Sequence, residues 1–93
     1  MLNNYRIFET NEFSRQLQKF PHPRRTFLQK KLKEYVYPQL MEEPYFGKNI
    51  KKLKGYSPET WRYRIGNTRL FYSCQEKEKI VYILTIDLRK NAY

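Results

Sequence analysis

The sequence predicts an α+β fold in which two N-terminal helices pack on one face of a mainly antiparallel sheet, in the order β-α-α-β-β-β. Apolar residues at helical spacing are confined to the first forty positions, whereas β-rich runs separated by short polar turns fill the chain from residue 61 onward. The 93 residues include nine Tyr, six Phe and one Trp, which is enough for one packed core. We therefore expect a single domain over residues 1–93.

The chain before residue 40 predicts a short strand and two helices. The alternating residues Tyr5 to Phe8 indicate the strand, and Thr10 is a suitable N-terminal cap for a helix that runs to about Phe20. Pro21-His22-Pro23 breaks this helix, and a second helix follows as far as Pro38, which ends or kinks it. The apolar stripes of the two helices are expected to be core: Phe13, Leu17 and Phe20 in the first, and Phe27, Leu28, Leu32, Tyr35 and Val36 in the second.

The second half of the chain predicts a loop and three strands. Residues 43 to 58 contain several prolines and glycines and are expected to be mostly loop, anchored to the core by Ile50 and Leu53. The strands are Trp61 to Ile65, Thr68 to Cys74, and Ile80 to Asp87. The last of these is apolar on both faces, which predicts a place in the middle of the sheet. Since the helices cover one face, the other face is left for function.

The charge of the chain indicates a polyanionic partner, with nucleic acid as the first expectation. Nineteen Lys and Arg against nine Asp and Glu give a formal net charge of +10. Between Pro44 and Tyr72, seven basic residues accompany the single acid Glu59, so this stretch carries +6 of the charge. A basic face kept only for solubility is the alternative, but solubility is better served by interspersed charges of both signs.

Composition argues against several other classes of protein. No apolar run approaches the roughly 20 residues that span a bilayer, and the N-terminus does not resemble a signal peptide, so we expect a cytoplasmic protein without a membrane partner. Cys74 is the only cysteine, which rules out an internal disulfide and predicts a small hydrophobe in a strand. His22, between two prolines, is expected to be a turn residue. The acids form no recognisable cluster, so no metal or cofactor is expected.

Gly66-Asn67 predicts a two-residue hairpin, with the glycine supplying the positive φ of a type II′ turn. This turn places Arg64 opposite Arg69 and puts Arg62 and Phe71 on the same face. Like charges directly opposite cost about 0.2–1 kcal/mol, so we expect an anion to lie between them. Arginine binds phosphate through two parallel hydrogen bonds, and Phe71 offers a ring for base stacking. The alternative is the solvent face of an ordinary surface hairpin.

RNA cleavage without a metal is the chemistry that these residues could serve. It requires a deprotonated 2′-hydroxyl, a protonated leaving oxygen and stabilised phosphoryl charge, and three arginines could supply the stabilisation: Arg62, Arg64 and Arg69. Tyrosine or lysine remains for proton transfer, because guanidinium neighbours lower the pKa of a phenol. Arg89 and Tyr93 follow the last strand and could emerge beside the hairpin, although a terminal residue is usually disordered.

Three blocks of the sequence resemble the RelE/ParE superfamily of toxins: Lys51 to Gly55, Trp61 to Tyr72, and Arg89 with Tyr93 after the apolar last strand. The resemblance spans nearly the whole chain, including the two N-terminal helices. It implies a compact microbial-ribonuclease-like fold and the toxin of a type II toxin-antitoxin pair. In the RelE branch it implies metal-independent cleavage of mRNA in the ribosomal A site. A RelB-like antitoxin, mRNA and the ribosome become the expected partners.

The resemblance also assigns roles by motif position. The catalytic residues would be Arg62, Arg64, Arg69, Arg89 and Tyr93. Arg62 and Arg64 would engage the scissile phosphate and leaving group, and Arg69 would stabilise the transition state. Tyr93 would take part in proton transfer from the 2′-hydroxyl, and Arg89 is the basic residue after the last strand. The RNA-binding residues would be Lys51, Lys52, Lys54 and Phe71.

Two departures from the family pattern concern proton transfer. Arginine stands at positions 62 and 64, where the best-known member has lysine, and arginine is the poorer proton donor. Leu88 stands before Arg89, where many relatives carry a histidine. The reaction would then rest on positioning and on groups of the ribosomal RNA.

Two other functions are open on the same residues. The ParE branch shares the fold and inhibits DNA gyrase without catalysis, but the joint presence of Arg64, Arg69, Arg89 and Tyr93 favours the ribonuclease branch. A plain RNA-binding module would use the same arginines for affinity and would leave no 2′,3′-cyclic phosphate product. In either branch a toxin with net charge +10 favours an acidic or amphipathic antitoxin segment, which we expect to inhibit by occlusion.

Overall fold

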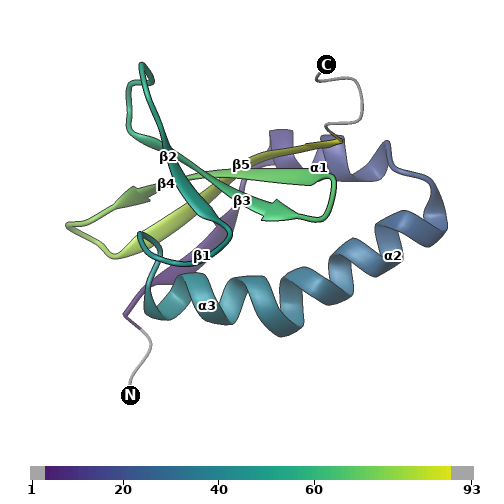
Figure 1. Cartoon of the computed structure of the whole chain (residues 1–93), viewed down its shortest axis with the longest axis horizontal. Helices are drawn as coiled ribbons and strands as arrows, with labels where there is room; N and C mark the ends of the chain where they lie inside the picture. Colours follow the sequence, from purple (N-terminus) through teal and green to yellow (C-terminus); the bar gives the residue numbers. More distant parts are fainter. Residues whose placement is uncertain (1–3, 89–93) are drawn as a thin grey trace.

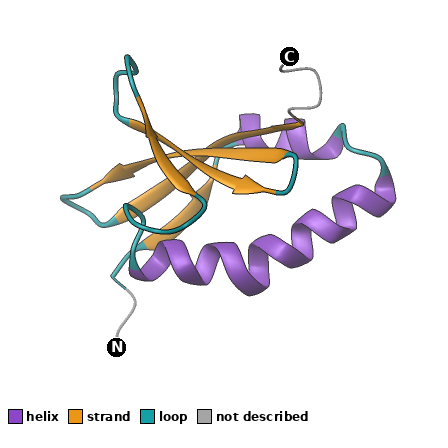
Figure 2. Ribbon diagram, in the orientation of Figure 1, coloured by secondary structure: helices purple, strands orange, loops and turns teal. Residues whose placement is uncertain are grey.

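The structure is a computed structural model that describes residues 4–88 (Figure 1). In chain order the elements are β1 (Arg6–Glu9), α1 (Asn11–Gln18), α2 (His22–Lys31), a π-helical turn η1 (Leu32–Val36), α3 (Tyr37–Glu42), β2 (Ile50–Leu53), β3 (Thr60–Ile65), β4 (Thr68–Gln75) and β5 (Ile80–Leu88). From α2 to α3 the chain forms one long helical segment that runs along the sheet (Figure 2). Within residues 4–88 no helix has the length and apolar character that a membrane crossing requires.

The five strands form one mixed sheet in the order β1-β5-β4-β3-β2. Strand β1 runs parallel to β5 and the other neighbours are antiparallel, which confirms the predicted mainly antiparallel α+β fold. As its two-sided apolar pattern predicted, β5 lies inside the sheet, between β1 and β4. Cys74 lies half-buried in β4 against the core, and burial raises the pKa of its thiol to about 11.

Strand β2 lies where a loop was predicted, so the order of elements contains one more strand than expected. The prolines and glycines of residues 43–58 flank the four residues Ile50–Leu53 and do not interrupt them, which leaves room for a short strand. It pairs antiparallel with β3 and forms the edge of the sheet. Its two central residues, Lys51 and Lys52, are exposed, and lysines on an edge strand discourage pairing with another chain.

Helix α1 begins and packs as predicted. The Thr10 side chain accepts a hydrogen bond from the Phe13 backbone N–H at 3.2 Å and itself donates to the Ile83 carbonyl of β5 at 2.8 Å, so the cap also ties the helix to the sheet. The predicted apolar face is buried: Phe13, Leu17 and Phe20. His22 is the first residue of α2 and not a turn residue, since a proline at the following position is tolerated in the first turn of a helix.

Pro38 neither ends nor visibly breaks the second helix, which continues to Glu42. The π turn just before it changes the hydrogen bonding, because the Tyr37 N–H donates to the Leu32 carbonyl five residues back. The buried residues of this segment lie four apart: Leu28, Leu32, Val36 and Leu40. In a regular α-helix each such step overshoots a full turn by about 40°. The wider π turn reverses part of this drift and keeps the stripe on the sheet.

Phe27 and Tyr35 were predicted to be core, and this prediction is wrong. Each stands one residue before a buried position of the four-residue stripe, about 100° around the helix, and their exposed fractions are 49% and 59%. Both rings instead lie under cations. The Arg24 guanidinium carbon is 5.4 Å from the Phe27 ring centroid, and Lys31 Nζ is 4.5 Å from that of Tyr35.

The β3–β4 hairpin has the predicted register, with Arg64 opposite Arg69 and Trp61 opposite Tyr72. Gly66 has a φ of 60° and Asn67 is outside the left-handed region, which agrees with a type II′ turn. Four side chains of the hairpin pack in the same core as those of the helices: Tyr63, Ile65, Leu70 and Tyr72. The alternating positions, which include Arg62, Arg69 and Phe71, lie on the other face.

A β-bulge shifts the register of β5 against β4 between Phe71 and Tyr72, which leaves Leu84 as an extra residue on β5. The spacing of the buried β5 side chains therefore changes from two residues to three: Val81, Ile83 and Ile86. Because side chains alternate along a strand, this change moves Asp87 to the face away from the helices.

The corrected core makes a direct prediction. Leu40 is fully buried, so Leu40→Ala should lower the free energy of unfolding by about 2–5 kcal/mol. Tyr35→Ala removes a larger but exposed side chain and should change it by about 0.5 kcal/mol or less. Urea denaturation followed by circular dichroism measures both. Comparable losses in the two variants would mean that Tyr35 belongs to the core after all.

Candidate functional site

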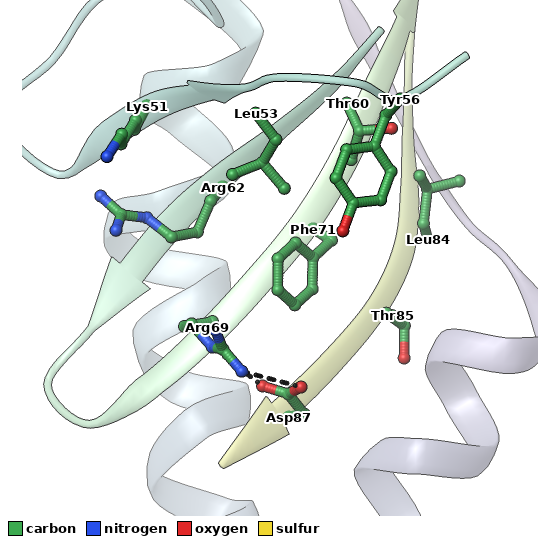
Figure 3. Close-up of a pocket in the computed structure, with 10 residues that line it drawn as sticks. All are labelled: Lys51, Leu53, Tyr56, Thr60, Arg62, Arg69, Phe71, Leu84, Thr85 and Asp87. Carbon is green, nitrogen blue, oxygen red and sulfur yellow. Dashed lines mark hydrogen bonds and ion pairs between the residues drawn. The ribbon is translucent and has the colours of Figure 1, made fainter. Parts of the chain in front are cut away.

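The face of the sheet opposite the helices carries a pocket of about 550 Å³ (Figure 3). Its residues come from β2, β3, β4, β5 and the segment between β2 and β3, so it forms only when the sheet is assembled. They are Lys51, Leu53, Tyr56, Thr60, Arg62, Arg69, Phe71, Leu84, Thr85 and Asp87. We call this the sheet pocket.

Arg69 and Asp87 form an ion pair at one end of the sheet pocket. They lie directly opposite each other on β4 and β5, and both the Nε–Oδ1 and Nη2–Oδ2 distances are 3.3 Å. The side chains are 30% and 46% exposed. The anion expected beside Arg69 is therefore supplied within the chain, from β5, and does not lie between the two arginines. This arrangement uses two of the five guanidinium N–H groups and leaves three for a ligand.

Arg62 and Lys51 occupy the other side of the same pocket. They are neighbours across β2 and β3, and Figure 3 shows their head groups close to each other while Arg69 turns toward Asp87. The Arg69 guanidinium carbon is 5.4 Å from the centroid of the Phe71 ring, whereas the Arg62 head group extends away from that ring (Figure 3). The sheet pocket thus contains guanidinium groups from two neighbouring strands and one aromatic ring.

Arg64 does not share this pocket, although its backbone lies opposite that of Arg69. Its side chain is exposed and lines a separate groove together with Arg24 and Lys31 of α2. Of the three arginines that were expected to converge on one anion, only Arg62 and Arg69 line the same pocket, and their head groups point in different directions, toward Lys51 and Asp87 respectively. Arg64 stands at the turn end of β3, where the twisted hairpin approaches the long helical segment.

The remaining sequence-predicted residues are distributed as follows. Lys51 and Phe71 line the sheet pocket. Lys52 lies outside it and pairs with Glu59, with an Nζ–Oε2 distance of 3.0 Å, and Lys54 lies near that pair in the turn after β2. Arg89 and Tyr93 lie outside the described residues.

Several lining residues of the sheet pocket were not predicted from the sequence, and two of them, Tyr56 and Asp87, matter to its chemistry. Tyr56 is 60% exposed in the segment before β3, and its ring lies beside Phe71 (Figure 3). Nothing in the sequence marks this tyrosine, since it lies in a predicted loop. Asp87 was recognised only as the end of a strand, because regular alternation would have placed it on the core face.

Other tyrosines are unsuitable as proton acceptors. Burial, aided by neighbouring groups, raises the pKa of Tyr37, Tyr45 and Tyr72 above the usual value for a phenol. The Tyr37 hydroxyl donates to Glu9, and that of Tyr72 donates to the Pro44 carbonyl at 2.5 Å. Within residues 4–88, no group of three or more His, Cys, Asp or Glu side chains is placed to hold a metal ion.

Comparison with known proteins gives similarity in structure. No family model and no curated protein sequence matches the chain. A chain of the archaeal RelE-RelB complex from Pyrococcus horikoshii is 24% identical with a TM-score of 0.69, over 95% of this chain and 98% of that one. A chain of the RelBE2 toxin-antitoxin complex from Mycobacterium tuberculosis is 25% identical with a TM-score of 0.70, and the match covers 92% of this chain and 99% of that one. The isolated Escherichia coli RelE toxin is 22% identical with a TM-score of 0.66, and the match covers 96% of this chain and 90% of that one.

These similarities define a small α+β fold of the kind found in toxin-antitoxin toxins. More narrowly, the chain has the RelE fold, as the resemblance in its sequence predicted.

The ion pair predicts how the sheet pocket responds to a change of charge. Asp87→Asn removes a negative charge beside Arg69 but keeps an oxygen that can accept a hydrogen bond, so the pocket should bind anions more tightly. We expect the Kd of a short 2′-O-methyl RNA to fall about two- to tenfold in fluorescence anisotropy. Glu78→Gln makes the same charge change in the distant β4–β5 turn and should have little effect. A weaker complex with Asp87→Asn would contradict this prediction.

Proposed function

We propose that this chain is the toxin component of a type II toxin-antitoxin pair and a metal-independent endoribonuclease that cleaves mRNA on the ribosome and so inhibits translation. The observation that carries the proposal is the sheet pocket, which Arg62 and Arg69 from adjacent strands line together with the Phe71 ring. The RelE fold of the chain supports it.

The lining of the pocket is suited to one phosphate with its neighbouring bases. Lys51, Arg62 and Arg69 against Asp87 leave a net charge of +2 among its residues. Guanidinium groups bind phosphate oxygens in a fixed fork and stay charged at physiological pH. The rings of Phe71 and Tyr56 provide surfaces on which unpaired bases can stack. A single RNA strand would therefore cross β3 and β4 with a phosphate between the two arginines.

Cleavage would follow the metal-free route of RNA transesterification. The 2′-oxygen loses its proton and bonds to the adjacent phosphorus, the bond from phosphorus to the 5′-oxygen breaks, and that oxygen takes up a proton. The products are a 2′,3′-cyclic phosphate and a 5′-hydroxyl. Arg69 would stabilise the extra phosphoryl charge through its three remaining N–H groups, and Arg62 would hold the phosphate near the leaving oxygen. Fixing these groups on strands reduces the reorganisation that the reaction needs.

Proton transfer requires a group other than arginine, whose pKa is too high. Motif position assigns this role to Tyr93, and it matches Arg89 to the basic residue that follows the last strand in the family. Tyr56 would have a different role, since its exposed ring lies beside Phe71 and is placed to stack on a base.

The antitoxin partner would be RelB-like, because RelE-RelB complexes are among the structures to which this fold is similar. A net charge of +10 favours an acidic segment of that partner. An acidic side chain placed against Arg62 would compete with the RNA phosphate and so inhibit by occlusion.

Removing the transition-state arginine tests the proposed activity. Arg69→Ala should lower the cleavage rate at least about a hundredfold, the usual effect of losing one preorganised donor, and should abolish toxicity while antitoxin binding persists. Mapping of mRNA 5′ ends after induction in cells measures the cuts, which should lie within translated codons.

Lys77→Ala is the matched control, because it removes one positive charge from the distant β4–β5 turn and should leave cleavage unchanged. Unchanged transcripts together with trapped DNA gyrase would overturn the proposal in favour of a ParE-like activity.

The two tyrosine roles can be separated by paired substitutions. Tyr56→Phe keeps the ring and should preserve cleavage, whereas Tyr56→Ala should weaken RNA binding by about 1–3 kcal/mol, the usual value of one base stack. Tyr93→Phe should lower the cleavage rate without a comparable loss of binding. Loss of cleavage in Tyr56→Phe at full RNA affinity would transfer the proton role to Tyr56.

A further inference from the structure

A second depression, of about 670 Å³, lies between the long helical segment and the turn of the β3–β4 hairpin. We call it the helix–hairpin groove, and the residues that matter to its chemistry are Arg24, Phe27, Lys31, Tyr35, Arg64 and Asn67. It begins close to the sheet pocket, because Arg64 stands two residues from Arg62 on β3, about 7 Å along the strand.

The charge of this groove is all of one sign. Among the described residues that line it, Arg24, Lys31 and Arg64 are cationic and none is acidic. In the sheet pocket, by contrast, Asp87 offsets part of the charge of Arg69. Three cations without a built-in counter-ion repel one another, so the groove favours a ligand with repeated negative charge.

The groove also exposes two aromatic rings that the sequence pattern had placed in the core. Phe27 and Tyr35 stand eight residues apart on the helical segment, about 12 Å along its axis, and each has a cation over its ring. A cationic groove with exposed rings at intervals is the usual surface for single-stranded nucleic acid, since every base can stack on a ring.

The groove is preformed at its hairpin end. Nη2 of Arg24 donates to the Asn67 side-chain oxygen and to the Thr68 hydroxyl, both at 2.8 Å. These bonds join α2 to the hairpin turn and fix the direction of the Arg24 guanidinium. A ligand would therefore meet a cation that is already ordered, which lowers the entropic cost of binding.

We propose that the helix–hairpin groove binds a single RNA strand that continues from the sheet pocket, with phosphates near Arg24, Lys31 and Arg64 and bases stacked on Tyr35 and Phe27. This inference rests on the proposed RNA substrate and adds a second binding region to it. Arg64 then holds the strand beyond the scissile phosphate. An acidic protein segment is the competing occupant, but the paired rings and cations, and the continuity with the sheet pocket, favour RNA.

The test compares two 2′-O-methyl RNAs in fluorescence anisotropy, a trinucleotide that fills only the sheet pocket and a dodecamer that also reaches the groove. Tyr35→Ala should weaken the dodecamer complex about tenfold and leave the trinucleotide complex unchanged. Phe46→Ala, which removes another exposed ring, is the matched control and should affect neither.

The salt dependence gives a second readout that a change in folding would not produce. Lys31→Gln should reduce the slope of log K against log salt for the dodecamer by about 0.7, the value for one phosphate contact with a single strand. Lys33→Gln removes the same charge from the same helical segment outside the groove and should leave the slope nearly unchanged.

Each outcome separates the two proposals. If Tyr35→Ala and Lys31→Gln match their controls while Arg69→Ala weakens both RNAs, the groove does not bind RNA and the inference fails, although the sheet pocket stands. If the groove variants lose an antitoxin peptide but keep the dodecamer, the occupant is protein and the inference also fails. If Arg69→Ala leaves the affinity for the trinucleotide unchanged, the proposed role of the sheet pocket fails. A loss of dodecamer affinity that is confined to the groove variants would still support RNA binding in the groove.

Discussion

The register of the β3–β4 hairpin determines both the core and the cationic face of this protein. Because strand side chains alternate, the tight turn at Gly66-Asn67 sends Tyr63 and Leu70 toward the helices and sends their neighbours to the opposite face. A slip of one residue would bury arginines in an apolar layer. The free-energy cost of burying these charges would exceed the small net stability of a domain of this size. The pocket and the core are therefore two results of one local geometry.

Much of the fold could be predicted because its signals are local. A capping threonine, a two-residue turn and a two-sided apolar strand each act over a few residues, and α1, the hairpin and β5 follow from them. Strand β2 could not be predicted, since its existence depends on pairing with β3. The exposure of Phe27 and Tyr35 was missed because the buried stripe recurs every four residues, which a regular helix would not keep on one side without the π turn.

The candidate site was predictable only where it depends on the hairpin. Arg62, Arg69 and Phe71 follow from the turn, whereas Tyr56 comes from a segment without regular pattern. The separation of Arg64 from the other two arginines depends on how the long helical segment meets the end of β3, a tertiary contact that pairing rules do not describe. The roles assigned to Arg89 and Tyr93 remain predictions from motif position.

The extra residue at Leu84 allows one strand to serve two surfaces in succession. Before it, alternate side chains of β5 fill the interior, and after it the phase of alternation is inverted, so that a carboxylate emerges among cations. The net charge of the pocket thus depends partly on the backbone geometry of β5, and not only on which residues the sequence contains. A homologous chain could gain or lose this internal counter-ion through a single insertion or deletion in β5, with every arginine and lysine left in place.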